Sequence, residues 1–205
     1  MKIYLGITLM CVAAKVLERL ILDRIREDRE RRCRESQAGF RIGRSCSEQI
    51  FILRRVLEEK AEWGKPVVVV ALDFATAYDA VDRESLFRVL EAEGMDGKLL
   101  EILKAMHKNT VASVRVGGKL TDEFKVSRGV RQGSVLSPVL FVALMDWVLK
   151  EPVKGLNIGV RLHRSERLVD LDFADDVLLL ADSMMDAQKR DRGCRSGWEK
   201  SGSRA

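Results

Sequence analysis

The sequence has few cysteines and histidines, the residues that form disulfides in small proteins or bind zinc. Its 205 residues include four cysteines and two histidines. The cysteines, at positions 11, 33, 46 and 194, form no C-x-x-C pair, and the two histidines are equally isolated. This spacing argues against a zinc site and against a disulfide framework. Reduced thiols are therefore expected, which favours an intracellular protein, in the nucleus or the cytoplasm, over a secreted one.

Long hydrophobic runs are also scarce. The stretch "MKIYLGITLMCVAAK" at the start holds a Lys followed by mostly apolar residues, which loosely imitates a secretory signal. The stretch is too short to span a bilayer. Its apolar periodicity continues into "VLERLILDRI", which favours a helix packed on a core, with a signal peptide as the weaker alternative. No membrane partner is expected.

Charged residues are plentiful and unevenly placed. They make up 33% of the chain, against 46% hydrophobic residues, and the net charge is +5. This composition is that of a folded protein with a sizeable core. Acidic residues are interleaved with one basic run, so charge alone favours a solvated helix face over a nucleic-acid footprint. The run consists of Arg24, Arg26, Arg29, Arg31, Arg32 and Arg34.

Periodicity and capping signals predict helices and strands in mixed order, which is typical of an α+β domain. The run "PVVVVALDF" is typical of a strand buried on both faces, and Gly117-Gly118 between alternating apolar residues predicts a β-hairpin. Residues 188–205 are rich in Arg, Gly and Ser, lose the hydrophobic periodicity and are expected to be disordered. Helices are expected over about 10–34, from Ser45 or Ser47 to about Trp63, after Asp82, over 96–109 and from Ser137.

Two adjacent aspartates, Asp175 and Asp176, interrupt the apolar segment "LVDLDFADDVLLLA". Buried carboxylates are costly unless something positive neutralises them. At the turn of a short hairpin, the two aspartates would both lie at one exposed edge. Magnesium or manganese is the cation that such oxygen ligands favour. A third carboxylate, Asp73, ends the β-branched strand and could join them to hold two metal ions for phosphoryl transfer. Spacing alone leaves open an ordinary turn for the pair and a cap for Asp73.

Three segments, in order, resemble motifs A, B and C of reverse transcriptases: "VVALDFATAYDAVD", "GVRQGSVLSPVLF" and "LDFADDVLLLA". They are especially similar to those of non-LTR (LINE-type) retrotransposons. Upstream, "GITLMCVAAKVLERLILDRI" and "SQAGFRIGRSCSEQIFILRRVLEE" resemble the fingers segments of the same family. The resemblance covers about Gly6 to Ala187.

The resemblance implies a polymerase palm with partial fingers, in which an antiparallel sheet packs on helices and the thumb is missing. Residues 1–66 would be fingers segments, 67–187 the palm with motifs A, B and C, and 188–205 a tail. The implied activity is RNA-directed DNA polymerisation, with two Mg²⁺ or Mn²⁺ ions as cofactors. The implied partners are an RNA template, a DNA primer whose 3′-hydroxyl is extended, and a dNTP.

The resemblance also implies roles for single residues of motifs A and C. Asp73, Asp175 and Asp176 would be the catalytic metal ligands. Phe74 would lend backbone contacts to the triphosphate. Tyr78 would lie under the nucleotide sugar and exclude a 2′-hydroxyl, with an ordinary core aromatic as the alternative.

Further roles are implied outside these two motifs. Gln132 and Gly133 resemble the motif B turn that meets the incoming nucleotide and template, where glycine lets the backbone approach closely. Arg41 and Arg44 would face the template or the triphosphate, with a solvated loop as the alternative. Leu5 departs from the pattern, because the family commonly has a basic residue at this position.

The resemblance weakens after Ala187, where a motif D lysine and a thumb have no visible counterpart. Two alternatives to an active polymerase therefore stay open. One is a truncated, catalytically inactive retroelement remnant, and the other is a polymerase-derived RNA-binding module. The intact aspartate triad favours the polymerase.

Overall fold

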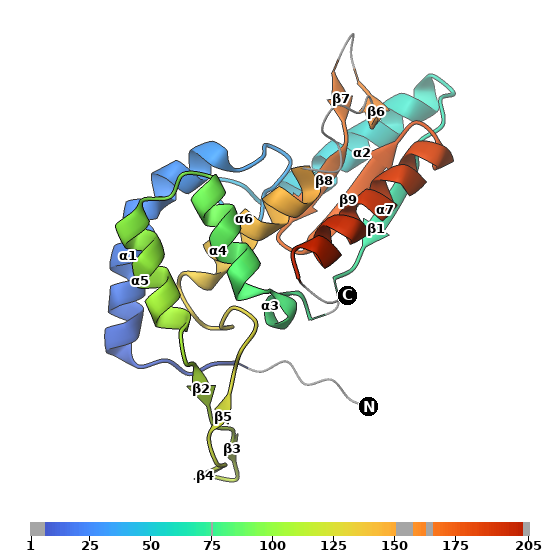
Figure 1. Ribbon diagram of the computed structural model, residues 1–205. Coiled ribbons are helices and arrows are strands. Elements are labelled where there is room, and N and C mark those ends of the chain that lie inside the picture. Colours follow the sequence, from blue (N-terminus) through green and yellow to red (C-terminus); the bar gives the residue numbers. More distant parts are fainter. Residues whose placement is uncertain (1–6, 75, 151–157, 163–165, 203–205) are drawn as a thin grey trace.

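The computed structural model describes residues 7–74, 76–150, 158–162 and 166–202. Helices and strands follow one another in mixed order (Figure 1), which confirms the α+β class. The helices are α1 (Val12–Arg32), α2 (Cys46–Glu62), α3 (Ala77–Ala80), α4 (Arg83–Ala92), α5 (Gly97–His107), α6 (Ser137–Lys150) and α7 (Met184–Lys200). The strands are β1 (Val68–Leu72), β2 (Val111–Ala112), β3 (Arg115–Val116), β4 (Lys119–Leu120), β5 (Phe124–Lys125), β6 (Val160–Arg161), β7 (Arg167–Leu168), β8 (Asp170–Phe173) and β9 (Asp176–Ala181).

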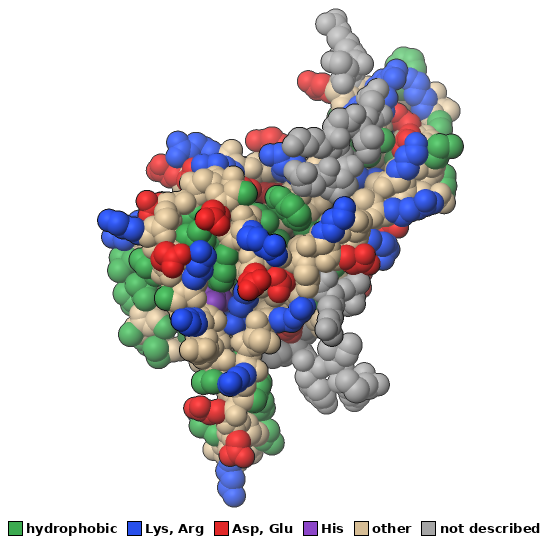
Figure 2. Space-filling view, in the orientation of Figure 1, with side chains coloured by type: hydrophobic (Ala, Val, Ile, Leu, Met, Phe, Trp, Pro, Cys, Tyr) green, Lys and Arg blue, Asp and Glu red, His purple; other side chains and the backbone are tan. Residues whose placement is uncertain are grey.

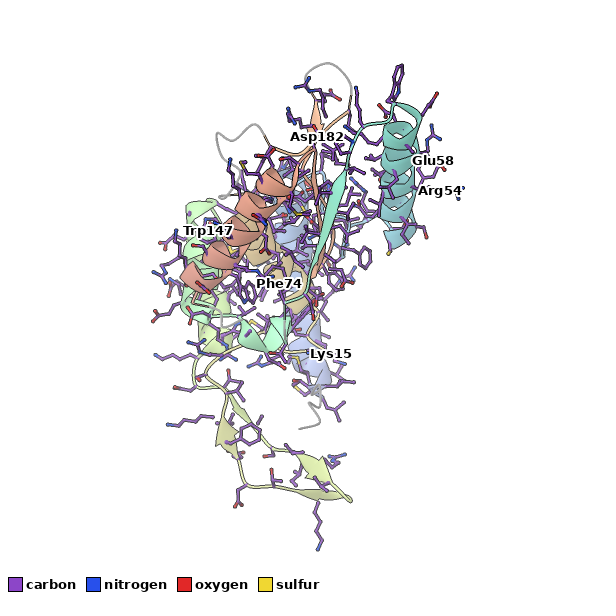
Figure 3. The ribbon with its side chains drawn as sticks, turned by 90° about the vertical axis from the view of Figure 1, so that its right-hand side faces the viewer. Lys15, Arg54, Glu58, Phe74, Trp147 and Asp182 are labelled. Carbon is purple, nitrogen blue, oxygen red and sulfur yellow. The ribbon has the colours of Figure 1, made fainter. Side chains whose placement is uncertain are left out.

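The central sheet has three antiparallel strands in the order β1-β9-β8. One face contributes Leu72, Val177 and Leu179 to the main core, which helices α1, α4, α5, α6 and α7 complete. The other face contributes Leu171 and Leu180 to a smaller core under α2. Figure 3 shows the strands between α2 and α7. The antiparallel sheet is therefore packed on helices, as expected, and helices lie on both of its faces.

Strand β1 is less buried than the sequence suggests, so the expectation of burial on both faces is wrong. Its first four residues alternate between half-buried and exposed, Val69 keeps 39% of its surface exposed, and Leu72 is the buried residue of the strand. The reason is its position at the edge of the sheet, where β9 is its one partner among the described strands. A run of β-branched residues signals a strand, but it does not reveal whether that strand is central.

Helix α1 joins the core through its C-terminal half only. Ile21, Leu22 and Ile25 are buried in the main core, whereas Val12 and Val16 are 77% and 54% exposed. The predicted core helix is thus correct for the later turns of α1. None of the helices in the described ranges is long and apolar enough to cross a membrane.

The predicted hairpin around Gly117-Gly118 is confirmed. Both glycines have positive φ, 56° and 82°, between the paired strands β3 and β4. Two positive φ values in a two-residue loop are those of a type I′ turn, which glycine adopts without strain. Strands β2 and β5 pair behind it, and the whole ribbon projects from the body (Figure 1).

The prediction of a disordered tail from residue 188 is wrong for the residues that α7 contains. Ser183 caps this helix by accepting a hydrogen bond from the Asp186 backbone N–H. Cys194 and Trp198 are 0% and 2% exposed, and Arg190 is buried beside them. These residues recur at helical spacing on one face, but the stripe holds a cysteine and an arginine instead of large aliphatic residues. Because this stripe has low hydrophobicity, the sequence pattern did not predict the helix. Residues 203–205 lie outside the described ranges.

Trp198→Ala tests whether α7 is part of the folded core. We expect the free energy of unfolding to fall by about 3–5 kcal/mol, because the ring is fully buried against the core. Urea denaturation followed by circular dichroism measures it. The matched control is Trp63→Ala, since Trp63 is 68% exposed and should change stability by about 0.5 kcal/mol or less. Equal small effects of the two substitutions would show that α7 is not packed.

Candidate functional site

The register of the sheet brings the three predicted aspartates to one edge. Leu72, the last residue of β1, pairs with Val177, so the next position, Asp73, lies across from Asp176. Asp176 in turn pairs with Phe173 at the end of the β8–β9 hairpin, and Asp175 lies in the two-residue turn between them. The three acids converge because β1 ends where β9 begins.

The three carboxylates interact electrostatically. Burial raises the pKa of Asp175, and the negative charges of Asp176 and Asp73 raise it further. Asp73 and Asp176 are exposed, and Asp175 is half-buried. Within the described part of the chain, no three His, Cys, Asp or Glu side chains are gathered closely enough to hold a metal ion as they stand. The backbone thus brings the acids to one edge, while their side chains do not form a closed ligand set.

The aromatic residues after Asp73 lie beside this edge. The ring of Tyr78 stacks on Phe141 of α6, with centroids 4.4 Å apart. Its pKa is raised, mainly by burial and also by the charge of Asp175, which places the phenol near that carboxylate. Phe74 packs on Trp198, with centroids 5.0 Å apart, and so links the strand end to α7. The roles assigned to Phe74 and Tyr78 remain predictions.

The turn before α6, which contains Gln132 and Gly133, is held by the N-terminal segment. The Thr8 backbone N–H donates to the Gln132 carbonyl at 2.7 Å. Gly133 has a φ of 105°, and a Cβ at this position would lie 2.6 Å from the Thr8 carbonyl oxygen. The buried Glu18 carboxylate accepts from the Val135 N–H at 2.7 Å. Glycine is therefore needed at 133 for both its backbone conformation and the close approach.

Arg41 and Arg44 lie in intramolecular ion pairs. The Arg41 guanidinium pairs with Glu30 and donates to the carbonyls of Arg34 and Gln37 at 2.9 Å each. Arg44 donates to Glu48 at 2.9 Å and to Glu35 at 3.1 Å. Both side chains are thus engaged by the protein itself, and contact with a nucleic acid or a triphosphate remains a prediction.

The basic run of α1 is mixed with acidic partners. Arg32 pairs with Asp28 at 2.8 Å, one helical turn away, and the two side chains are 39% and 42% exposed. Figure 2 shows basic and acidic side chains interspersed over the face in view. This arrangement supports a solvated helix face for most of the run, as the charge pattern suggests. Arg29 and Arg34 are exceptions. Arg29 is buried and pairs with Glu93.

The role of Arg34 was missed by the sequence analysis. Its guanidinium donates twice to Asp170, at 2.9 and 2.8 Å, and its Nε donates to Asp146 at 3.1 Å. It also pairs with Asp172, which is fully buried, and Arg190 of α7 donates to Asp170 at 2.5 Å. The cluster ties the end of α1 to α6, α7 and β8, the strand that leads into the aspartate turn.

The charges of this buried cluster do not balance, because it holds three aspartates and two arginines. Burial raises the pKa of Asp170, but Arg34 and Arg190 outweigh it and hold that pKa below its usual value. Burial and the charge of Asp170 raise the pKa of Asp172 well above its usual value. Asp172 Oδ1 has no hydrogen-bond partner among the described residues. A proton that relieves the excess negative charge would therefore bind to Asp172 before Asp170.

Comparison with solved structures shows the class of fold. A telomerase from Candida albicans, solved with a fragment of telomeric RNA, aligns over 93% of this chain and 32% of its own, with a TM-score of 0.59 and 17% identity. A telomerase from Candida tropicalis, solved without ligand, aligns over 93% of this chain with a TM-score of 0.58 and 14% identity. The chain therefore shares its fold with part of these telomerases, which is consistent with a palm-like fold.

Sequence comparison gives the family. The profile of the family described as "Reverse transcriptase (RNA-dependent DNA polymerase)" matches residues 2–202. The chain therefore belongs to the reverse transcriptase family, and the match extends past Ala187 through α7, further than the motifs suggest.

The curated relatives come from non-LTR retrotransposons, as the motifs predict. The Pol polyprotein of a type-1 retrotransposable element R2 from Popillia japonica is 30% identical over 178 residues, which cover 86% of this chain and 25% of that protein. The RNA-directed DNA polymerase from the mobile element jockey of Drosophila funebris is 28% identical over 183 residues, 88% of this chain and 19% of that protein. The chain thus spans a quarter or less of these relatives' length.

Arg34→Met tests whether the buried cluster holds the hairpin in place. Removing the central guanidinium leaves three buried carboxylates near one another, so we expect the free energy of unfolding to fall by about 3–5 kcal/mol. Urea denaturation at neutral pH measures it. Arg32→Met is the matched control, because its solvent-exposed pair with Asp28 should contribute little to stability. A loss for Arg34→Met no larger than that of the control would contradict the assignment.

Proposed function

We propose that this chain is the catalytic part of a non-LTR retroelement reverse transcriptase. It would extend a DNA primer on an RNA template by adding a dNTP to the primer 3′-hydroxyl, with release of pyrophosphate. The observation that carries the proposal is the register that puts Asp73 across from Asp176 and beside the Asp175 turn. Family membership supports the same reaction class.

The aspartates fit hard divalent cations. Carboxylate oxygens are the ligands that Mg²⁺ and Mn²⁺ prefer. Burial and, after it, the charges of Asp176 and Asp73 raise the pKa of Asp175, and bound cations would offset those charges. Asp73 and Asp175 would be the ligands that hold the ions, and Asp176 would complete the acidic cluster. When bound, such an ion pair stabilises the attacking and leaving oxygens of a phosphoryl transfer.

The nucleotide would lie between the edge of the sheet and the turn before α6. Phe74, held by Trp198, would present its backbone to the triphosphate. Tyr78, held by its stacking on Phe141, would contact the sugar ring. Gln132 and Gly133 would meet the base and template. Arg41 and Arg44 of the fingers segment are candidates for phosphate contact, in which a phosphate would replace their acidic partners.

Asp175→Asn tests the proposed reaction. With an RNA template, a DNA primer, dNTPs and Mg²⁺ or Mn²⁺, the wild-type chain should extend the primer. The substitution should lower the extension rate by at least about 10²-fold, because an ion ligand is lost where transition-state charge is stabilised. Asp122→Asn, an exposed aspartate on the projecting ribbon, is the control and should retain activity.

Absence of extension by the wild-type chain with both metals would contradict the proposal. If that chain nevertheless bound RNA, the better explanation would be that it is a polymerase-derived RNA-binding module. Extension at equal rates by the wild type and Asp175→Asn would show that the activity does not arise at this site.

Tyr78→Val tests the sugar contact. A smaller side chain should leave room for a 2′-hydroxyl, so the ratio of kcat/KM for dNTP to that for the matching rNTP should fall by about 10-fold or more. Single-nucleotide extension with each substrate measures the ratio. Phe141→Leu, which removes the stacking partner and leaves the tyrosine in place, should change the ratio less. An unchanged ratio in Tyr78→Val would exclude Tyr78 as the discriminating residue.

A further inference from the structure

The segment Ser36–Gly39 runs alongside the β8–β9 hairpin, which carries Asp175 and Asp176. The Asp172 backbone N–H donates to the Ser36 carbonyl at 2.9 Å, and the Ala38 N–H donates to the Asp172 carbonyl at 2.9 Å. These bonds form a parallel bridge between Gln37 and Asp172. The segment therefore follows β8 on the side away from β9 and reaches the turn that carries Asp175.

Gln37 binds both backbone polar groups of Ala174, the first residue of that turn. Its Oε1 accepts from the Ala174 N–H at 2.8 Å, and its Nε2 donates to the Ala174 carbonyl at 3.2 Å. The same Oε1 accepts from the Gly39 N–H at 2.7 Å. Gln37 is 0% exposed, so these bonds are shielded from water. One buried amide thus fixes the backbone just before Asp175.

The turn needs such support. Ala174 has a φ of 60°, in the left-handed region that residues with a side chain rarely adopt. A hairpin turn with a positive φ at its first central residue ordinarily has glycine there. The two hydrogen bonds from Gln37 hold Ala174 in this conformation.

Gly39 allows the segment to lie against the turn. A Cβ at position 39 would lie 2.2 Å from the Ala174 nitrogen and 2.8 Å from its Cα. Both are backbone atoms, so any side chain at 39 must displace either the turn or the segment. Glycine is the residue that fits here.

We infer that Gln37 and Gly39 are positioning residues that set the place of the Asp175 carboxylate relative to Asp73. The inference rests on the proposed function, since it concerns the ligands proposed for the metal ions. Mg²⁺ demands near-ideal geometry, and a displaced ligand weakens its binding. Gln37 would act on metal affinity without touching the metal.

Gln37→Met tests the inference on the 205-residue chain. It keeps the length of the side chain and removes all three hydrogen bonds. The dissociation constant for Mn²⁺, measured by electron paramagnetic resonance without nucleic acid, should rise by about 10-fold or more. The Mg²⁺ concentration that gives half-maximal primer extension should rise in parallel. A purely structural role would reduce the amount of folded protein. It would leave the Mn²⁺ dissociation constant and the Mg²⁺ concentration for half-maximal extension unchanged.

Gln49→Met is the matched control. Gln49 is also a buried glutamine, 6% exposed, and it donates to the Ser36 carbonyl at 3.1 Å, away from the turn. It should keep the wild-type Mn²⁺ affinity. Gly39→Ala is the second test variant, because it leaves every hydrogen-bonding side chain in place and should also weaken Mn²⁺ binding. Circular dichroism shows which variants fold.

The outcomes separate the two proposals. Wild-type extension with an unchanged Mn²⁺ affinity in folded Gln37→Met or Gly39→Ala would overturn the positioning role and leave the polymerase proposal intact. An equal loss of affinity in Gln49→Met would also overturn it, since the effect would not depend on the turn. Absence of wild-type extension would instead refute the proposed function.

Discussion

The pairing of β1 with β9 in a single register is the constraint on which the rest of the structure depends. A shift by one residue would turn every side chain of β1 to the opposite face. Leu72 would then leave the main core, and Asp73 would no longer lie across from Asp176. The interactions that bury the sheet against α6 and α7 are therefore the same ones that bring the acids to one edge. Stability and the geometry of the candidate site have a common origin.

The hairpin that carries Asp175 and Asp176 is fixed from the side of the N-terminal segments. Arg34 binds the aspartates of β8 through its guanidinium, and the residues that follow it hydrogen-bond along β8 as far as the turn. A buried charge cluster is weak evidence for added stability, but it strongly disfavours arrangements that leave its charges unpaired. The cluster and the Gln37 amide together restrict where the turn can lie.

Sequence reasoning succeeded where the signal is local. Ser45 and Asp82 cap their helices, and Gly117-Gly118 forms its hairpin, because each depends on a few neighbouring residues. It failed where the cause is distant: Arg34 is buried because its partner Asp170 lies 136 positions away. Helix α7 was missed because its inner face includes Arg190, whose burial depends on that same aspartate. The motifs identified the acids of the candidate site, but they could not reveal what holds them.

The central claim is that the edge formed by Asp73, Asp175 and Asp176 binds divalent cations. Anomalous diffraction from crystals of the chain soaked in Mn²⁺ tests it most directly, because the anomalous signal locates manganese independently of activity. The account predicts a peak between the Asp73 and Asp175 carboxylates that disappears in Asp175→Asn crystals. Manganese bound elsewhere on the chain, with no peak at this edge, would contradict it.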